Sequence, residues 1–343
     1  MKPRIALVGL GMAVAPHAKG LLDLEREGLC EVVAAYAPSA ERRAAFSATY
    51  PFPTTDDLDT LFSDPGITAV GILTPPNTHR DLVQRAARAG KHILLEKPLE
   101  ITTARAEELV RAAEAAGVKL AVMLQHRFRP AGERLRAFLA EGRLGQIVNC
   151  STSIRLWRPQ SYYDEPGRGT LARDGGGVLM TQAIHTLDLM LSLAGPIVEV
   201  RGFGSTSPVH RMEAEDMVAA GVRFASGALG VIEATTAVFP GFAERIEIAG
   251  TRGSAVLAGT SLDIVCVDGT KETMSADGSA GGTGADPMAF PHDYHRAAWA
   301  DFLEAVATRR PPRVTGREAL DVHRLIDALL AAGAATTSVR VSG

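Results

Sequence analysis

Short apolar runs alternate with helical patterns through the first 122 residues, and this alternation constrains the fold more than any other feature. The apolar runs lie at residues 5–9, 32–36, 69–74, 92–96 and 119–124. The helical patterns between them lie at 13–27, 39–50, 78–89 and 103–116. Strands that are apolar on both faces and separated by helices indicate a parallel sheet covered on both sides. We therefore expect an α/β, doubly wound domain over residues 1–124.

A different pattern begins at Gln125. After helices at 130–141 and 177–194, with an alternating strand at 149–157 between them, strand-like runs follow one another with glycine-containing turns, such as VEVRGFGS, MVAAGVRF and ERIEIAG. Two further helices are expected at 293–308 and 316–333, and a mobile loop in the Gly/Ser/Ala-rich segment 275–287. Helix-poor spacing of this kind is typical of antiparallel or mixed sheets. Residues 125–343 are thus predicted to form an α+β domain on a large, open, mixed or antiparallel sheet.

Composition excludes several functional classes. The 343-residue chain is 46% hydrophobic and carries a net charge of −3, so no basic nucleic-acid surface is expected. Its uncharged apolar runs are too short for a membrane span or a signal peptide. Cys30, Cys150 and Cys266 fit neither a zinc site nor a disulfide framework, so no metal is expected. These features predict a cytoplasmic protein.

The first strand ends in a turn that suits a dinucleotide. Gly9 and Gly11, followed by Met12 and Ala13, open a helix directly after an apolar strand, where a pyrophosphate binds a helix N-terminus. The third glycine of the usual motif is replaced by Val14, so a plain strand-turn-helix stays an alternative.

The end of the second strand bears on the choice of cofactor. It lacks the carboxylate that binds the ribose of NAD and offers Ser39 and Arg42 instead. This favours NADP over NAD, unless Arg42 belongs to a solvated helix face.

Two later motifs connect the chain to a known family. TPPNTH at 74–79 and EKP at 96–98, together with GLG at 9–11, strongly resemble the glucose–fructose oxidoreductase/inositol dehydrogenase/MocA-like (Gfo/Idh/MocA) family. The stretch DGGGVLMTQAIHTLDLM at 174–190 and the segment 292–312 resemble it as well, so the likeness covers nearly the whole chain.

This resemblance implies a fold, an activity and an assembly. The fold is a Rossmann domain followed by a substrate domain whose open sheet pairs with another subunit in a homodimer or homotetramer. The activity is nicotinamide-dependent oxidation of a secondary alcohol on a sugar, cyclitol or sugar derivative. The resemblance also implies that Lys97 and His185 are catalytic, and that the cofactor-side residues include Thr74, Pro75, Pro76, Asn77, His79, Glu96 and Gln125.

The residues themselves agree with this acid/base assignment. Removing a hydride from an alcohol leaves a proton for a side chain to take, and burial or charge tunes lysine and histidine for that task. Lys97 follows a parallel strand, at the end where ligands bind in such sheets. A solvated loop lysine remains the alternative for Lys97, and a core histidine for His185.

The helix at 177–194 carries three polar residues on one face. Thr181, His185 and Asp188 are spaced i, i+4 and i+7, and glycines 175–177 are expected to leave room for a ligand. Many members of the family have aspartate where Thr181 stands, so a Lys-Asp-His set is not expected here. We expect Thr181 to orient the substrate, and Asp188 to hold the histidine tautomer or to pack.

A polar and aromatic segment at 155–170 is the predicted substrate side. Fork-shaped arginines and aromatic faces suit sugars and anionic groups. The expected substrate contacts are Arg127, Trp157, Arg158, Tyr163, Arg168, Thr181 and the catalytic pair. An interface loop is the alternative for this segment.

Two other functions share the predicted fold. One is a non-enzymatic NAD(P)-sensing regulator, which the presence of Lys97 and His185 disfavours. The other is a dihydrodiol-, imine- or biliverdin-type reductase, in which His185 would be expendable. The sequence does not name the substrate, because a fold fixes the reaction type and leaves the pocket open.

Overall fold

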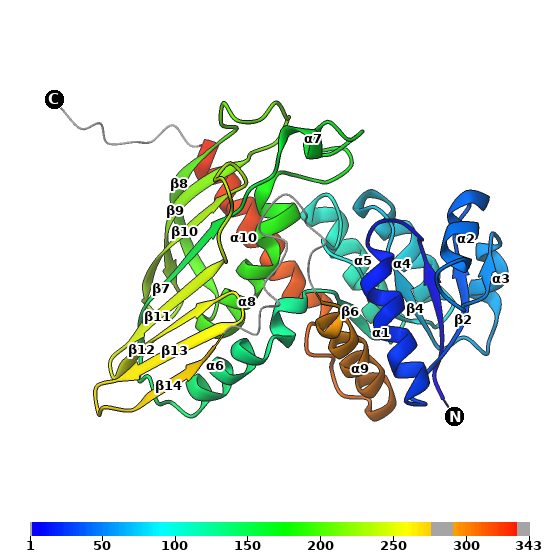
Figure 1. Cartoon of the computed structure of the whole chain (residues 1–343), viewed down its shortest axis with the longest axis horizontal. Coiled ribbons are helices and arrows are strands. Elements are labelled where there is room, and N and C mark those ends of the chain that lie inside the picture. The colour runs from blue at the N-terminus through cyan, green and yellow to red at the C-terminus, as the bar shows by residue number, and fades with distance from the viewer. Residues whose placement is uncertain (1, 276–290, 335–343) are drawn as a thin grey trace. The chain divides into compact units, whose positions relative to one another are not determined.

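The computed structural model describes residues 2–275 and 291–334 (Figure 1). The chain forms two compact units. The first comprises Met1–Glu133, Leu171–Gly175 and Ala289–Asp321, and the second comprises Arg134–Thr170, Gly176–Met288 and Val322–Gly343. Each unit is thus built from three separate segments of the chain. The boundary expected after residue 124 stays a prediction. Except for Ser275, the loop expected at 275–287 lies outside the described residues.

The first unit contains the expected parallel sheet. Its six strands run in the order β3-β2-β1-β4-β5-β6, and every pairing is parallel. Their bounds are β1 Arg4–Val8, β2 Glu31–Tyr36, β3 Thr54–Thr55, β4 Ala69–Ile72, β5 His92–Leu95 and β6 Leu120–Val122. The sequence predicted all of these except β3, whose two threonines are too short a run to show a period. The Rossmann-type order places the carboxyl ends of β1, β4 and β5 next to one another.

Helices cover this sheet, and one of them comes from the far end of the chain. The helices that follow the early strands are α1 Val14–Arg26, α2 Ala40–Ser47, α3 Leu58–Ser63, α4 His79–Arg88 and α5 Thr103–Ala115, with short 3₁₀ turns η1 Pro76–Thr78 and η2 Gln125–Phe128. Helix α9, Asp293–Thr308, packs against α1 and β5 (Figure 1). A Cβ added to Gly71 of β4 would lie 2.8 Å from the Trp299 ring, so glycine makes room for this indole.

The second unit is built on the expected mixed sheet. Its eight strands run β14-β13-β12-β11-β7-β10-β9-β8 (Figure 1). Among the described residues of this second sheet, β7 and β10 pair in parallel and the other pairings are antiparallel. The bounds are β7 Ile147–Arg155, β8 Ile197–Ser205, β9 Met217–Phe224, β10 Leu229–Thr235, β11 Arg245–Gly250, β12 Gly253–Ala258, β13 Ser261–Cys266 and β14 Lys271–Met274.

One face of this sheet is buried and the other is exposed. Helix α8, Ile184–Ala194, packs against β7 and β11, and buried residues alternate with exposed ones along β9. Phe203, Leu229 and Val231 are among the large apolar residues left exposed. The remaining helices are α6 Pro130–Ala140, α7 Gln160–Tyr163 and α10 Gly316–Ala334. None of the helices within residues 2–275 and 291–334 has the length and apolar character needed to cross a membrane.

The predicted helix at 177–194 is not uniform. Residues Leu179–Ala183 form a π-helical turn, η3, and only then does α8 continue to Ala194. Such wide turns inside helices are frequent at functional sites. Thr181 lies in the π-helical turn and His185 in the first turn of α8.

Candidate active site

The turn after β1 has two glycines with different environments. Gly9 adopts φ 105°, its N–H donates to the Tyr36 carbonyl at 2.9 Å, and an added Cβ would lie 2.8 Å from Cγ2 of Thr74. Gly11 is the opposite case, because no heavy atom of the described chain would lie within 4 Å of an added Cβ. Gly9 is therefore required by the fold itself, whereas Gly11 opens onto free space.

The start of α1 fits a phosphate group. Ala13 is its N-cap residue, and among the described residues no side chain accepts a hydrogen bond at this cap. The N–H of Val14 donates to the Gly11 carbonyl at 3.2 Å and Pro16 has no N–H, so an anion at this end would meet the helix dipole and the remaining N–H groups of the turn. Met12 is exposed beside Gly11. This arrangement fits the pyrophosphate of a dinucleotide.

Ser39 and Arg42 follow β2, as the NADP hypothesis requires. The structure gives Ser39 another role, because its hydroxyl caps α2 by accepting the backbone N–H of Arg42 at 3.2 Å. Arg42 is exposed. Arg43 instead donates to the Ala37 carbonyl and to Asp56.

His79 connects the TPPNTH and EKP segments. It is fully buried, and its ring nitrogens contact the Thr74 carbonyl at 2.8 Å and the Pro98 carbonyl at 3.0 Å. Burial lowers its pKa, although the carbonyl contacts act in the opposite direction. His79 therefore holds two loops together, and its place beside the cofactor stays a prediction. Within TPPNTH, Pro75 and Asn77 are exposed, whereas Thr74 and Pro76 are half-buried.

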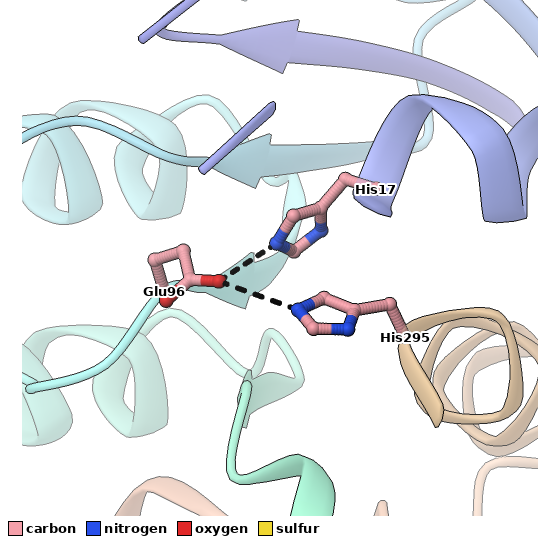
Figure 2. A group of neighbouring side chains, drawn as sticks. All are labelled: His17, Glu96 and His295. Atoms are coloured by element: carbon pink, nitrogen blue, oxygen red, sulfur yellow. Dashed lines mark hydrogen bonds and ion pairs between the residues drawn. The ribbon is translucent and has the colours of Figure 1, made fainter. Parts of the chain in front are cut away.

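Glu96 lies in a buried polar group drawn in Figure 2. Its Oε1 atom is 2.8 Å from Nε2 of His17 and 3.9 Å from Nε2 of His295, and its Oε2 atom accepts the backbone N–H of Lys97 at 3.0 Å. The indole N–H of Trp299 donates to Nδ1 of His17 at 3.0 Å. Three elements, α1, the end of β5 and α9, thus meet beside Lys97.

The electrostatics of this group keep Glu96 charged. Burial by itself would raise the pKa of Glu96, but the hydrogen bond from His17 and the charge of Lys97 lower it overall. Burial also lowers the pKa of His295 to about 3. The site therefore holds a carboxylate and a neutral imidazole next to the half-buried Lys97.

The glycines before the 177–194 helix do not leave room for a ligand as expected. A Cβ on Gly175 would lie 2.6 Å from Cα of Ile101, and one on Gly177 would lie 1.7 Å from the Glu215 carbonyl oxygen. The chain itself fills this space, and glycine is needed for that close packing. The expectation of ligand room at these positions was wrong.

Glu215 is a residue that sequence reasoning missed. Its carboxylate accepts the backbone N–H groups of Gly177 and Leu179, both at 3.1 Å, at the start of the helix. Burial raises its pKa. Thr181, for its part, donates its hydroxyl to the Gly177 carbonyl at 2.6 Å. The only sequence signal for Glu215 was an acidic run, EAED, which resembles a solvated turn.

His185 and Asp188 are both buried on α8. His185 belongs to the second unit and Lys97 to the first. Their action as a pair therefore stays a prediction.

Two arginines of the polar and aromatic segment 155–170 lie against the ring of Tyr162. The Arg158 and Arg168 guanidinium carbons lie 5.8 and 5.0 Å from the centre of its ring. Tyr163 is buried, with its hydroxyl 2.8 Å from that of Thr236, and burial raises its pKa. Tyr162, rather than Tyr163, is the tyrosine that both arginines share. Trp157 packs edge-on to Phe239 at 5.5 Å, and its carbonyl accepts a hydrogen bond from Nη1 of Arg158 at 2.7 Å.

Gln125 and Arg127 are both buried but differ in their polar partners. Arg127 is buried and forms an ion pair with Glu318 at 2.8 Å, which ties η2 to α10. Oε1 of the buried Gln125 has no hydrogen-bond partner in the part of the chain that the structure describes. A buried acceptor of this kind is satisfied by a donor from a bound molecule or a water, so Gln125 fits a ligand site.

Comparisons with known proteins agree with this geometry. Residues 3–124 match the family described as "Oxidoreductase family, NAD-binding Rossmann fold", and residues 133–256 match "GFO/IDH/MocA C-terminal domain". Together with the uncapped start of α1, the matches define an NAD-binding oxidoreductase.

Three relatives make the classification specific. The chain is 31% identical to 1,5-anhydro-D-fructose reductase of Ensifer adhaerens, over 84% of each protein. It is 25% identical to myo-inositol 2-dehydrogenase of Thermotoga maritima, over 92% of this chain and 91% of that protein. The structure superposes on the WlbA dehydrogenase of Bordetella pertussis, solved with NADH and UDP-GlcNAcA, with a TM-score of 0.81, 26% identity and 97% coverage of both chains. The chain belongs to the Gfo/Idh/MocA family.

Proposed function

We propose that the protein transfers a hydride between nicotinamide and a secondary alcohol or ketone of a sugar, cyclitol or sugar derivative, with Lys97 and His185 as acid and base. The observation that carries this proposal is the position of Lys97. It follows β5 at the carboxyl end of the parallel sheet, beside the Glu96 carboxylate and in the same unit as the Gly9–Gly11 turn.

The protonation chemistry follows from these side chains. When bound, the nicotinamide supplies the acceptor or donor of the hydride. Lys97 takes the hydroxyl proton during oxidation and returns it during reduction. His185 assists this transfer, and Thr181 orients the substrate without adding the charge that an aspartate would bring.

The substrate class is supported by two observations. The relatives above are named for a sugar ketone, a cyclitol and, in one solved complex, a sugar nucleotide. In this chain, the guanidinium groups of Arg158 and Arg168 lie against the Tyr162 ring. Arg168 is half-buried, whereas Arg158 is buried and donates to the Trp157 carbonyl at 2.7 Å. Planar guanidinium groups suit sugar hydroxyls or an acidic group.

The direct test is turnover with Lys97→Met. Wild type and variant are assayed with myo-inositol, 1,5-anhydro-D-fructose and UDP-GlcNAcA, each with NAD and NADP in the matching redox state. We expect wild-type turnover of at least one compound and a loss of about a hundredfold or more in kcat in the variant, with cofactor affinity nearly unchanged. Full activity in Lys97→Met would refute the assignment.

His185→Gln separates the proposed chemistry from its alternative. A large loss of kcat supports the Lys97–His185 pair. Retained activity together with a dead Lys97→Met variant would point to an imine- or dihydrodiol-type reductase, in which Lys97 alone protonates the product.

The cofactor proposal is that NADP binds at least as well as NAD. It rests on the absence of a carboxylate in the Tyr36–Ser39 stretch after β2 and on the exposed Arg42 one turn later. Fluorescence titration with NADH and NADPH tests it, and Arg42→Ala is the matched variant. A clear NADH preference in the wild type would overturn this part.

We also propose a homodimer or homotetramer that forms through the exposed face of the second sheet. Phe203 is exposed there on β8, and Leu229 and Val231 are exposed on β10, the two strands on either side of β9. Val231→Glu should dissociate the assembly in sedimentation experiments. The control is Val267→Glu, because Val267 is the same residue type and is also exposed but lies outside the strands. A monomeric wild type would refute the proposal.

A further inference from the structure

We propose that Trp299, His17 and Glu96 form a hydrogen-bonded positioning chain that fixes an oriented negative charge beside Lys97. The inference rests on the proposed function, in which Lys97 exchanges a proton with the substrate. None of the three residues needs to touch the substrate, so they act through Lys97.

The direction of the chain follows from the hydrogen bond of Trp299. An indole N–H only donates, so Nδ1 of His17, 3.0 Å away, must carry a lone pair. A neutral imidazole then carries its proton on Nε2, which donates to Oε1 of Glu96 at 2.8 Å (Figure 2). Trp299 and His17 are fully buried, so water does not compete for these positions.

The carboxylate of Glu96 is fixed at both oxygens. Oε1 accepts from His17, and Oε2 accepts the backbone N–H of Lys97 at 3.0 Å. A glutamine has only one acceptor oxygen and cannot take both bonds. Glu96 therefore fixes the backbone at Lys97 and places a full negative charge next to it.

The same geometry argues against a metal ion at this group. One ligand atom each from His17, Glu96 and His295 lies within 4.8 Å of the others, a set that resembles a metal site. Metal binding at Nε2 of His17 would require the proton on Nδ1, where it would face the indole N–H of Trp299. The tautomer set by Trp299 thus makes His17 a donor to Glu96 and removes it as a ligand.

The fixed charge acts on the proton that Lys97 handles. During oxidation the substrate C–H bond delivers its hydride to the nicotinamide, the O–H bond delivers its proton to the Lys97 amine, and a C=O bond forms. The resulting ammonium is stabilised by the Glu96 carboxylate. The interaction is mutual, because the charge of Lys97 also contributes to lowering the pKa of Glu96.

The first experiment needs no substrate. Nitrogen-15 NMR of labelled histidine, assigned with His17→Gln, reports which ring nitrogen of His17 carries the proton. We expect the Nε2–H tautomer, unchanged by added Zn²⁺ or by EDTA. An Nδ1–H tautomer, or His17 signals that move with stoichiometric Zn²⁺, would overturn the proposal.

The second experiment measures the proton affinity of Lys97 directly. Lysines are reductively methylated with carbon-13 and titrated by NMR, and the Lys97 signal is assigned with Lys97→Arg. Removing the neighbouring charge in Glu96→Gln should weaken proton binding at Lys97 about tenfold. An unchanged Lys97 titration in this variant would refute the role of Glu96.

A matched pair of variants tests His17. Glutamine reproduces both bonds of the imidazole, since its oxygen can accept from Trp299 while its amide donates to Glu96. His17→Gln should therefore keep the wild-type Lys97 titration, and His17→Leu should shift it as Glu96→Gln does. If His17→Leu does not fold, Trp299→Phe is used, and it should let His17 sample the other tautomer.

Kinetics then separate this inference from the proposed function. With the substrate found by the panel, Glu96→Gln should lower kcat about tenfold to a hundredfold and shift the acid limb of alcohol oxidation to lower pH. KM should change little. A dead Lys97→Met variant beside fully active Glu96→Gln and His17→Leu would refute the chain alone, whereas an active Lys97→Met would refute the proposed function.

Discussion

The two glycines after β1 offer a sharp test, because the structure assigns them different tasks. Gly9 has φ 105°, and an added Cβ would meet the carbonyl carbon of Leu73 at 3.0 Å and Cγ2 of Thr74 at 2.8 Å. Gly11 has no such restriction: no described heavy atom lies within 4 Å of its Cβ position, and its φ is not positive. One alanine substitution should therefore damage folding, and the other only binding.

The magnitudes differ enough to measure. In Gly9→Ala the backbone strain is about 1 to 3 kcal/mol, and the overpacking against Leu73 and Thr74, which follow β4, is also about 1 to 3 kcal/mol. The loss of roughly 2 to 6 kcal/mol corresponds to a fall of about 5 to 20 °C in Tm. Gly11→Ala should leave Tm unchanged or raise it slightly, because alanine restricts the unfolded chain.

Cofactor binding provides the second readout. A methyl group on Gly11 occupies the space into which a pyrophosphate would fit, so the Kd for NADH should rise at least about tenfold, equivalent to about 1.4 kcal/mol. The assays are thermal unfolding and fluorescence titration with NADH. If Gly11→Ala bound NADH like the wild type, the assignment of this turn to the dinucleotide would be refuted. If it lost stability as Gly9→Ala does, the assignment of open space would be wrong.

Two further predictions concern stability. Burial lowers the pKa of His295 from 6.5 to about 3, so the unfolded chain takes up a proton below pH 6.5 that the folded chain does not. The contribution of His295 to the free energy of unfolding is therefore fully present above pH 6.5 and is lost on acidification, by about 2 kcal/mol at pH 5. Urea unfolding at pH 7 and pH 5 tests this: between these pH values the free energy of unfolding of His295→Asn should fall by about 2 kcal/mol less than that of the wild type. An equal fall in both proteins would contradict the burial argument. Glu215→Gln should lower the free energy of unfolding by about 1 to 2 kcal/mol, because one amide oxygen replaces two acceptors at the helix start. The exposed Glu213→Gln is its control, and equal losses in both variants would refute the capping role.

The architecture could be predicted because it depends on local patterns. Buried strands such as β1 and β4 are apolar on both faces, whereas exposed and buried residues alternate along β9. The spacing of apolar residues in the sequence therefore predicts each kind of sheet. The roles of Ser39 and His79 were not visible in the same way. Ser39 is expected near a 2′-phosphate, which stays a prediction, and in the structure it caps α2. His79 bridges two loops that a linear motif shows separately.

Contacts between distant segments account for what sequence reasoning missed. Glycines 175–177 suggest ligand room when they are considered alone, yet Ile101 and Glu215 fill that space in the folded chain. Glu215 itself looks like part of a solvated acidic turn until its carboxylate is found at the start of the 177–194 helix.

The sequence by itself determined the two-part α/β and α+β organisation, the strand-turn-helix at Gly9 and Gly11, and the placement of Lys97 at a strand end. Periodicity and short motifs carry that information, since they depend on neighbours in the chain. Only the tertiary structure decided what surrounds Lys97. Trp299 reaches His17 across 282 positions, and their hydrogen bond sets the tautomer that holds Glu96. A proton's position on an imidazole depends on both partners at once, and folding alone brings those partners together.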